Sequence, residues 1–485
     1  MKREKSLVLL LTILVILMLT ACATFNKSHT SHFAQQQRMV EQGRIEEVAQ
    51  KLDAKARNEG RDGVLHALAA GYYYLFMQDY EKSKELFHMA ENQIASYEER
   101  AIISARDIAN GAKAALTSDM ELPYKGQMFE KIMVNTLLAM NYLFKRDIEG
   151  ANVEIRRAEL RQKQAMDKHQ KELEKIEKQK EENKIEDKSL NSICSHYNVL
   201  DEYAAKVINS FQNGFTYFLG GLVYELNQSP NDAYLDYKKS FKLYNNKYIL
   251  EKLIELSQQL NRQDENENWV SMYKDFFNGE AQIHNPGKNP NPENAELVVV
   301  YFCGNVPRKT QAKFSLWLPK KSFNVAFPFY DKNTFYTDNG LLEINRNGET
   351  LGKSELVLDF NPIVVKALKE KLPGIVVRQI IRLIAKNELE KKAEKKGGVL
   401  GEIGAKIFKT VTERADLRGW YELPCNIQVF RSKIEPGQSK ITLKEISESG
   451  EFFIEDIDLD IPEKRTALVF VQQLSSETST HTIVL

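Results

Sequence analysis

Small and aromatic residues recur along the first half of the chain at offsets that let two antiparallel helices pack closely. The first set comprises Gly71, Tyr72, Tyr73, Tyr74, Tyr80, Ser83, Phe87 and Ala90. The second set, shifted by 68 residues from Gly71 to Ala139, comprises Ala139, Tyr142, Ile148, Ala151, Ile155 and Ala158. A third set, out of phase with the others, comprises Gly221, Tyr224, Ala233, Tyr237 and Ser240. This pattern predicts helical hairpins that repeat along the chain.

The shift of 68 residues equals two periods of the tetratricopeptide repeat, which is about 34 residues long. In such repeats the small residues let the two helices approach, and the aromatic residues fill the gap between successive units. The copy expected around Ala105 and Ile108 is degenerate. We therefore predict an α-solenoid of tetratricopeptide-like helical repeats over residues 35–283.

Residues 161–188 interrupt this pattern with a run made almost entirely of Lys, Glu, Gln and Asp. Leu173, Ile176 and Ile185 are its rare apolar residues. Glu and Lys at helical spacing stabilise a helix by roughly 0.2–0.5 kcal/mol per pair. The insertion therefore predicts a solvated helix or arm. A partner-binding coiled coil is the alternative, although the sustained apolar heptads that it needs are missing.

A second region begins after residues 284–295, where three prolines and a glycine predict a linker. Beyond it, short runs of β-branched and aromatic residues predict strands, and residues 364–396 have a long helical pattern. The predicted strands cover residues 296–302, 312–318, 355–359, 426–431, 441–446 and 467–472. Residues 296–485 are thus expected to form a β-rich mixed domain, a sheet or a sandwich, with a helical excursion. The whole chain is predicted to be an α+β multidomain protein.

The N-terminus has the features of a secretory signal peptide. Lys2, Arg3 and Lys5 precede an uncharged apolar run over residues 7–19, which is shorter than the roughly 20 residues that a spanning helix needs. The run ends in Leu19-Thr20-Ala21-Cys22. This ending resembles the bacterial lipobox, in which cleavage follows acylation of the cysteine.

From this resemblance we expect residues 1–21 to be removed, Cys22 to carry lipid and residues 22–34 to form a lipidated tether. Several acyl chains, at about 0.8 kcal/mol per buried methylene, would make the membrane anchor essentially permanent. Ala23 rather than Asp follows the cysteine, which by the enterobacterial sorting rule implies the periplasmic face of the outer membrane. An ordinary signal peptide with a cysteine at this place is the alternative.

The charge balance and the cysteines limit which partners, metal sites and disulfides can be expected. Lys plus Arg and Asp plus Glu both number 67, so no overall field attracts nucleic acid, and none is expected as a partner. Cys194, Cys303 and Cys425 remain beside Cys22, with a spacing unlike that of a zinc ribbon. At most one internal disulfide is possible, with Cys303 and Cys425 the favoured pair. Three buried thiols are the alternative.

Signatures of catalysis are absent from the sequence. The eight histidines include no His-Glu-x-x-His pair, and no Gly-x-Ser-x-Gly elbow occurs. The glycine-rich segment 397–408 lacks the Gly-Lys-Ser/Thr of a phosphate-binding loop. It predicts close helix packing or, alternatively, a contact with a membrane or partner. We therefore expect no enzymatic activity, no metal and no cofactor.

Residues 412–424 contain Ala-Asp-Leu-Arg-Gly-Trp-Tyr-Glu-Leu-Pro. This run resembles the Ala-Asp-x-Arg-x-Trp-x-x-Leu-Pro signature of an uncharacterised family of bacterial envelope lipoproteins. In that family tetratricopeptide-like repeats precede a strand and a turn with Pro and a basic residue, as in Pro307-Arg308-Lys309. The long charged insertion departs from the family pattern. The resemblance implies the layout of most of the mature chain and brings no known activity.

The signature residues have two interpretations. Asp416 and Arg418 are two residues apart and would lie on the same side of an extended strand. They can form an ion pair that, with a buried Trp420, pins the following loop. Alternatively they form a ligand or partner site, to which Arg308 and Lys309 add positive charge.

The leading functional hypothesis is a non-catalytic protein-interaction scaffold in the cell envelope. In it, the concave face of the repeats receives an extended peptide or a partner domain. The alternatives are an accessory factor for peptidoglycan or surface-structure assembly and, different in kind, an enzyme acting on envelope glycans. A groove lined by Tyr and Asn would favour the scaffold, and a deep polar pocket around Asp416 would favour the enzyme.

Overall fold

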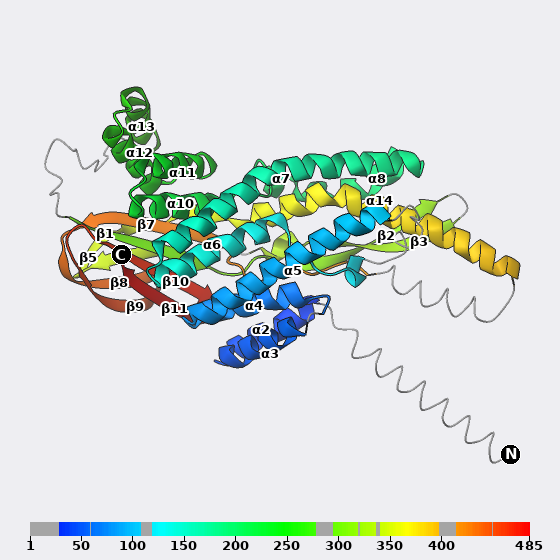
Figure 1. Ribbon diagram of the computed structural model, residues 1–485, viewed down its shortest axis with the longest axis horizontal. Coiled ribbons are helices and arrows are strands. Elements are labelled where there is room, and N and C mark those ends of the chain that lie inside the picture. The colour runs from blue at the N-terminus through cyan, green and yellow to red at the C-terminus, as the bar shows by residue number, and fades with distance from the viewer. Residues whose placement is uncertain are drawn as a thin grey trace, which may run out of the picture.

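The computed structural model describes residues 29–58, 60–107, 119–277, 294–318, 321–335, 340–396, 414–448 and 450–485. Helices form the N-terminal region and strands dominate the C-terminal region, so the fold is α+β (Figure 1). The predicted signal peptide, Cys22, most of the predicted linker 284–295 and the glycine-rich segment 397–408 lie outside the described residues.

Helices joined by short turns make up the N-terminal region, and neighbouring helices pack in pairs. Before the sheets the structure describes α2 (His29–Val40), α3 (Ile45–Arg57), α4 (Gly63–Phe76), α5 (Tyr80–Asp107), η2 (Asp119–Glu121), α6 (Met128–Phe144), α7 (Ile148–Glu182), α8 (Asp187–Cys194), η3 (Ser195–Leu200), α9 (Asp201–Ala204), α10 (Gly214–Leu226), α11 (Pro230–Leu243), α12 (Lys247–Gln259) and α13 (Gln263–Phe276).

Three of these pairs, α4–α5, α6–α7 and α10–α11, share one turn geometry. The turn residues Gln78, Arg146 and Gln228 all have positive φ, at 61°, 59° and 55°. Gln78 and Arg146 are 68 residues apart, the same shift that relates the first two sequence sets. The periodic pattern in the sequence therefore coincides with equivalent helical hairpins.

Small residues bring the paired helices together, as their spacing predicted. A Cβ atom added to Gly71 of α4 would lie 2.8 Å from the ring of Phe87 in α5. A Cβ atom added to Gly221 of α10 would lie 2.5 Å from the ring of Tyr237 in α11. Both distances are too short for any side chain, so the aromatic ring of one helix occupies the space that glycine leaves on the other.

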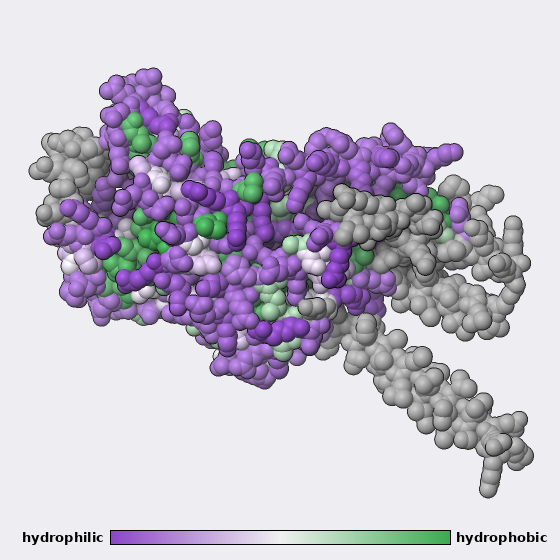
Figure 2. Space-filling view, viewed as in Figure 1, coloured by the Kyte–Doolittle hydropathy of each residue, from purple (hydrophilic) through white to green (hydrophobic). Residues whose placement is uncertain are grey.

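Most of the charged insertion, through residue 182, continues α7, and its last residues form a turn and the start of α8. α7 runs without a break through residue 182, and its surface beyond residue 166 is mainly exposed. Figure 2 shows a mostly hydrophilic surface over α7 and α8. Ile176 packs on the main core and lies close to Gly374, so one side of this solvated helix rests on another helix.

Strands form two larger sheets and a hairpin. One sheet has the order β11-β10-β1-β7-β6, with β1 and β10 parallel, and a second sheet has the order β5-β4-β8-β9. The described strands are β1 (Ala295–Cys303), β2 (Lys309–Leu318), β3 (Lys321–Tyr330), β4 (Leu341–Arg346), β5 (Glu349–Lys353), β6 (Glu355–Asp359), β7 (Asn426–Ile434), β8 (Gly437–Ser447), β9 (Gly450–Ile461), β10 (Thr466–Leu474) and β11 (Glu477–Val484), with helix α14 (Phe360–Lys396) between β6 and β7.

The five-stranded sheet is the middle layer of the molecule. Along β1, Val298 and Phe302 belong to the core shared with the helices, whereas Val299 and Tyr301 belong to the core between the two sheets. This alternation is expected of a strand that is covered on both faces. One face of the helical hairpins is thus packed against the chain's own sheet, with Phe215 5.3 Å from Phe302 between ring centroids.

Arg431 of β7 joins the five-stranded sheet to the helices α10 and α11. Its guanidinium makes bidentate contacts with Glu225 of α10 at 2.9 and 3.0 Å and with Glu296 of β1 at 2.6 and 2.7 Å. It also donates to the Tyr237 hydroxyl at 2.6 Å, and its side chain is 3% exposed. All five N–H donors are therefore used within the protein.

All six strands predicted from the sequence occur, within β1, β2, β6, β7, β8 and β10, and the predicted helix 364–396 lies within α14. Five further strands were not predicted from the sequence, namely β3, β4, β5, β9 and β11. Cys194, Cys303 and Cys425 are free thiols, so the favoured disulfide between Cys303 and Cys425 is not formed. The backbone N–H of Cys425, just before β7, donates to the carbonyl of Cys303 at the end of β1 at 2.9 Å, so the two residues lie side by side.

His481 of β11 predicts how stability depends on pH. Its buried ring accepts or donates a hydrogen bond at the Tyr80 hydroxyl, 3.1 Å away, and packs on Phe144 and Phe470. Burial lowers its pKa from 6.5 to about 4. Between these values the unfolded chain binds the proton and the folded chain does not, so acidification from pH 7.5 to 5 should cost about 2 kcal/mol through this residue.

Urea unfolding of wild type and His481→Gln at both pH values measures this contribution. Burial also lowers the pKa values of His29 and His66 to about 4, so the comparison is between variants and not with a pH-independent protein. The loss on acidification should be smaller in His481→Gln and unchanged in the control His196→Gln, whose ring is exposed. Equal losses in all three proteins would show that His481 is not buried in its neutral form.

Candidate functional site

A cavity of about 530 Å³ lies where the helices meet the C-terminal region. Its walls come from residues 119–130, from α14, from the β2–β3 hairpin and from the signature segment 414–421. Lys309, Asp416, Arg418 and Trp420 all line it, so the structure brings together four of the five predicted motif residues. Arg308 is exposed and does not line the cavity, and its guanidinium is 5.9 Å from the ring of Phe33.

Segment 414–421 is not the extended strand that we expected, because residues 414–420 pair with no neighbouring strand. The predicted ion pair nevertheless forms. Arg418 Nε donates to Asp416 Oδ1 at 2.9 Å and Arg418 Nη2 donates to Oδ2 at 2.7 Å. Burial alone would raise the pKa of Asp416, but the hydrogen bonds and charge of Arg418 hold it below its ordinary value.

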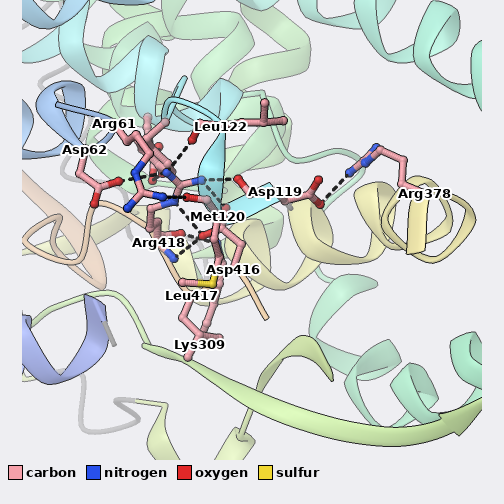
Figure 3. A network of polar contacts seen from close by, with 12 residues as sticks. Arg61, Asp62, Asp119, Met120, Leu122, Lys309, Arg378, Asp416, Leu417 and Arg418 are labelled. Carbon is pink, nitrogen blue, oxygen red and sulfur yellow. Dashed lines mark hydrogen bonds and ion pairs between the residues drawn. The ribbon is translucent and has the colours of Figure 1, made fainter. Parts of the chain in front are cut away.

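Arg418 also joins distant parts of the chain (Figure 3). Its Nη1 donates to Asp62 Oδ1 at 3.0 Å and to the Leu122 carbonyl at 2.9 Å, and its Nη2 donates to the Asp119 carbonyl at 2.8 Å. Together with the contacts to Asp416, these use all five N–H donors of the guanidinium. Arg418 therefore holds the cavity wall in place and has no donor left for a ligand.

Trp420 anchors the same segment on the first helical hairpin. Its ring is 1% exposed and lies 6.2 Å from Tyr72 and 5.8 Å from Phe87 between centroids. Its backbone N–H donates to Glu130 Oε1 at 2.9 Å. The ion pair and buried tryptophan thus match the structural interpretation of the signature, whereas the cavity beside them is what the ligand interpretation requires.

Glu130 is a second organiser of the wall, which the sequence analysis missed. Its carboxylate accepts hydrogen bonds from the Tyr124 hydroxyl at 2.6 and 2.8 Å, from the Gln127 backbone at 2.6 Å and from the Trp420 backbone. Glu130 also caps the N-terminus of helix α6 as part of a capping box with Gln127, a local role that a sequence can suggest. Its contact with a segment 290 residues away has no local signal.

Lys309 ties the β2–β3 hairpin to the signature segment. Its Nζ donates to the Arg418 carbonyl at 2.7 Å, and its backbone N–H donates to the Tyr421 hydroxyl at 3.2 Å. Burial lowers the pKa of Lys309. Its positive charge lies beside the motif, as the sequence analysis anticipated for a ligand site.

Helix α14 contributes further cations that the sequence analysis did not single out. Lys371, Arg378 and Arg382 line the cavity, and Arg382 forms an ion pair with Asp119. Arg378 Nη2 is 3.5 Å from the same carboxylate, and Lys371 Nζ donates to Gln127 Oε1 at 2.5 Å. Their spacing of seven and four residues in an otherwise apolar pattern places them on one helix face, which is the signal that could have found them.

Within the described ranges, no group of three or more His, Cys, Asp and Glu side chains could hold a metal ion. Among the helices of those ranges, none is long and apolar enough to cross a membrane. No known protein family, curated protein or solved structure matches this chain.

Removing the Arg418 guanidinium should destabilise the protein strongly. Arg418→Ala removes a buried guanidinium, leaves the half-buried carboxylate of Asp416 without its partner and leaves the carbonyls of Asp119 and Leu122 without their donor. Breaking a buried ion pair of this kind costs about 3–5 kcal/mol. Arg418→Lys should lose most of this stability too, because an ammonium cannot make the bidentate contact while reaching two other segments. Urea unfolding followed by tryptophan fluorescence measures both losses.

Arg308→Ala is the matched control, because Arg308 carries the same charge, lies in the same motif region and is exposed. Its effect on the free energy of unfolding should stay within about 0.5 kcal/mol. Similar losses for Arg308→Ala and Arg418→Ala would contradict the assignment of Arg418 as the residue that joins the wall.

Proposed function

We propose that the protein is a lipid-anchored bacterial envelope protein that acts as a non-catalytic protein-interaction scaffold. The lipobox ending in Cys22 supports the anchor and the periplasmic face of the outer membrane. The three equivalent hairpins, with their shared turns and their glycine–aromatic contacts, support tetratricopeptide-like repeats. The signature at Ala415–Pro424 supports a relationship to the uncharacterised envelope lipoprotein family.

The observation that carries the scaffold proposal is the division of the helical surface. One side of the hairpins packs on the chain's own sheet, so a partner protein would contact the other side. There α7 presents Leu160 and Met166 with 53% and 57% of their surface exposed, among charged residues. Mixed apolar and charged surface on a rigid helix is suited to a reversible protein interface.

The glycan-enzyme alternative is less well supported, although a polar cavity does lie around Asp416. The Asp416 carboxylate is paired with Arg418, and the Glu130 carboxylate accepts hydrogen bonds from two segments. Glycoside hydrolysis needs one carboxyl group held as an acid and another free to act as base or nucleophile. These two carboxylates instead support the cavity wall, which favours binding over catalysis.

In-cell photocrosslinking tests the scaffold. A photoreactive phenylalanine analogue placed at Leu160 or Met166 of the natively lipidated chain should yield one dominant adduct with an envelope protein, identified by mass spectrometry. The matched position is Phe453 on β9, which is 64% exposed and lies in the second sheet. Adducts should be absent there and should be lost from α7 in Cys22→Ala, which cannot carry the lipid.

Two results would count against the proposal. Adducts from Phe453 alone would move the interface to the sheet, and no adduct above the Cys22→Ala background would remove the scaffold function. Retention of Cys22→Ala in the membrane fraction, with no lipid label on the wild type, would separately overturn the anchor.

A further inference from the structure

The cavity face of α14 changes character along the helix axis. Three and four residue steps keep this face aligned, and at about 1.5 Å per residue positions 364 to 382 span about 27 Å. Val364, Ala367 and Leu368 line the cavity in the first turns of α14, and Lys371, Arg378 and Arg382 line it in the later turns, with Ile375 between them. The cavity therefore has an apolar half and a charged half.

Positive charge exceeds negative charge at this site. Among the described residues that line the cavity, eight are Lys or Arg and three are Asp or Glu. Arg418 and Asp416 compensate each other, and Asp119 is shared between Arg378 and Arg382. Lys371 contacts the neutral amide of Gln127. The charged half thus favours an anion.

The carbonyl oxygen of one buried amide side chain next to these cations lacks a partner. Gln379 lines the cavity and is 6% exposed, and its Oε1 accepts no hydrogen bond from any residue that the structure describes. Leaving such an oxygen unpaired costs about 1–3 kcal/mol. Because Oε1 can only accept, its complement in a ligand is a hydrogen-bond donor beside the anion, such as the hydroxyl group of a polyol.

We propose that the cavity binds an anionic amphiphile with a phosphate ester of a polyol as its head group. The phosphate lies between Lys371 and Arg378, a hydroxyl of the polyol donates to Gln379, and an apolar chain follows the first turns of α14. Burial lowers the pKa of Lys371 to about 8, so a bound phosphate would restore the charged ammonium that burial disfavours.

The position of the cavity suits a ligand drawn from a membrane. The ring of His29 stacks on Tyr421 of the cavity wall at 5.4 Å between centroids, and its Nε2 is 3.1 Å from the Gly419 carbonyl. His29 follows Cys22 by seven residues, which reach at most about 25 Å. This membrane proximity rests on the proposed lipid anchor, whereas the binding site itself does not.

Isothermal titration of the full-length, natively processed protein in a nonionic detergent tests the site. The probe is dioctanoyl phosphatidylglycerol, and glycerol 1-phosphate, inorganic phosphate and dioctanoyl phosphatidylcholine separate the contributions of chain, polyol and charge. Phosphatidylglycerol should bind at least tenfold more tightly than each of the others. The double variant Lys371→Met, Arg378→Met should weaken its binding at least tenfold, and Gln379→Leu severalfold.

Lys366→Met is the matched control, because Lys366 is a half-buried lysine of the same helix that does not line the cavity. It should bind the probe as the wild type does, and thermal unfolding of every variant shows whether it is folded. Equal affinity for glycerol 1-phosphate would contradict binding of the apolar chain. Equal affinity for phosphatidylcholine would contradict recognition of the anionic head group. No binding of phosphatidylglycerol would overturn the proposed site. These outcomes are independent of the Cys22→Ala localisation test.

Discussion

The packing of the helical hairpins on the five-stranded sheet is the constraint on which the rest of the structure depends. β1 is buried on both faces, with Phe302 against the helices and Tyr301 against the second sheet. Buried apolar surface contributes about 25 cal/mol per Å², and neither region can bury its contacting face without the other. The helical and β-rich regions therefore share a core, although their sequence patterns change abruptly between them.

Two arginines give this packing its register. Arg431 joins β7 to α10, α11 and β1, and Arg418 joins the signature segment to the residues around Asp62 and Asp119. Each uses all five guanidinium donors, so a small sliding of the helices would leave two buried guanidinium groups without partners. Apolar side chains would bury equally well but would not distinguish one docking position from its neighbours. We infer that these two residues specify the geometry more than they add to stability.

Local patterns in the sequence predicted many of the strands and helices, whereas contacts between distant segments could not be predicted from them. β6 was predicted with its observed bounds, 355–359, because its apolar run is short and sharply bounded. β9 was missed because its acidic and exposed residues, including Glu451 and Asp456, resemble a loop. The ion pair of Asp416 and Arg418 followed from their spacing. The contact of Arg418 with Asp62 spans 356 residues, and no periodicity in either segment indicates it.

The same packing decides where function can reside. Helical hairpins that stand alone leave both faces free for a partner, but here one face packs on the chain's own sheet, and Trp420 packs against Tyr72 and Phe87. A partner that used this surface would have to displace a buried tryptophan and the ion pair beside it, which costs several kcal/mol. A partner could bind the helical surface that faces away from the sheet, or the cavity at the junction, without displacing these contacts. Binding is therefore expected at these two places, one suited to a protein and the other to a small anionic ligand.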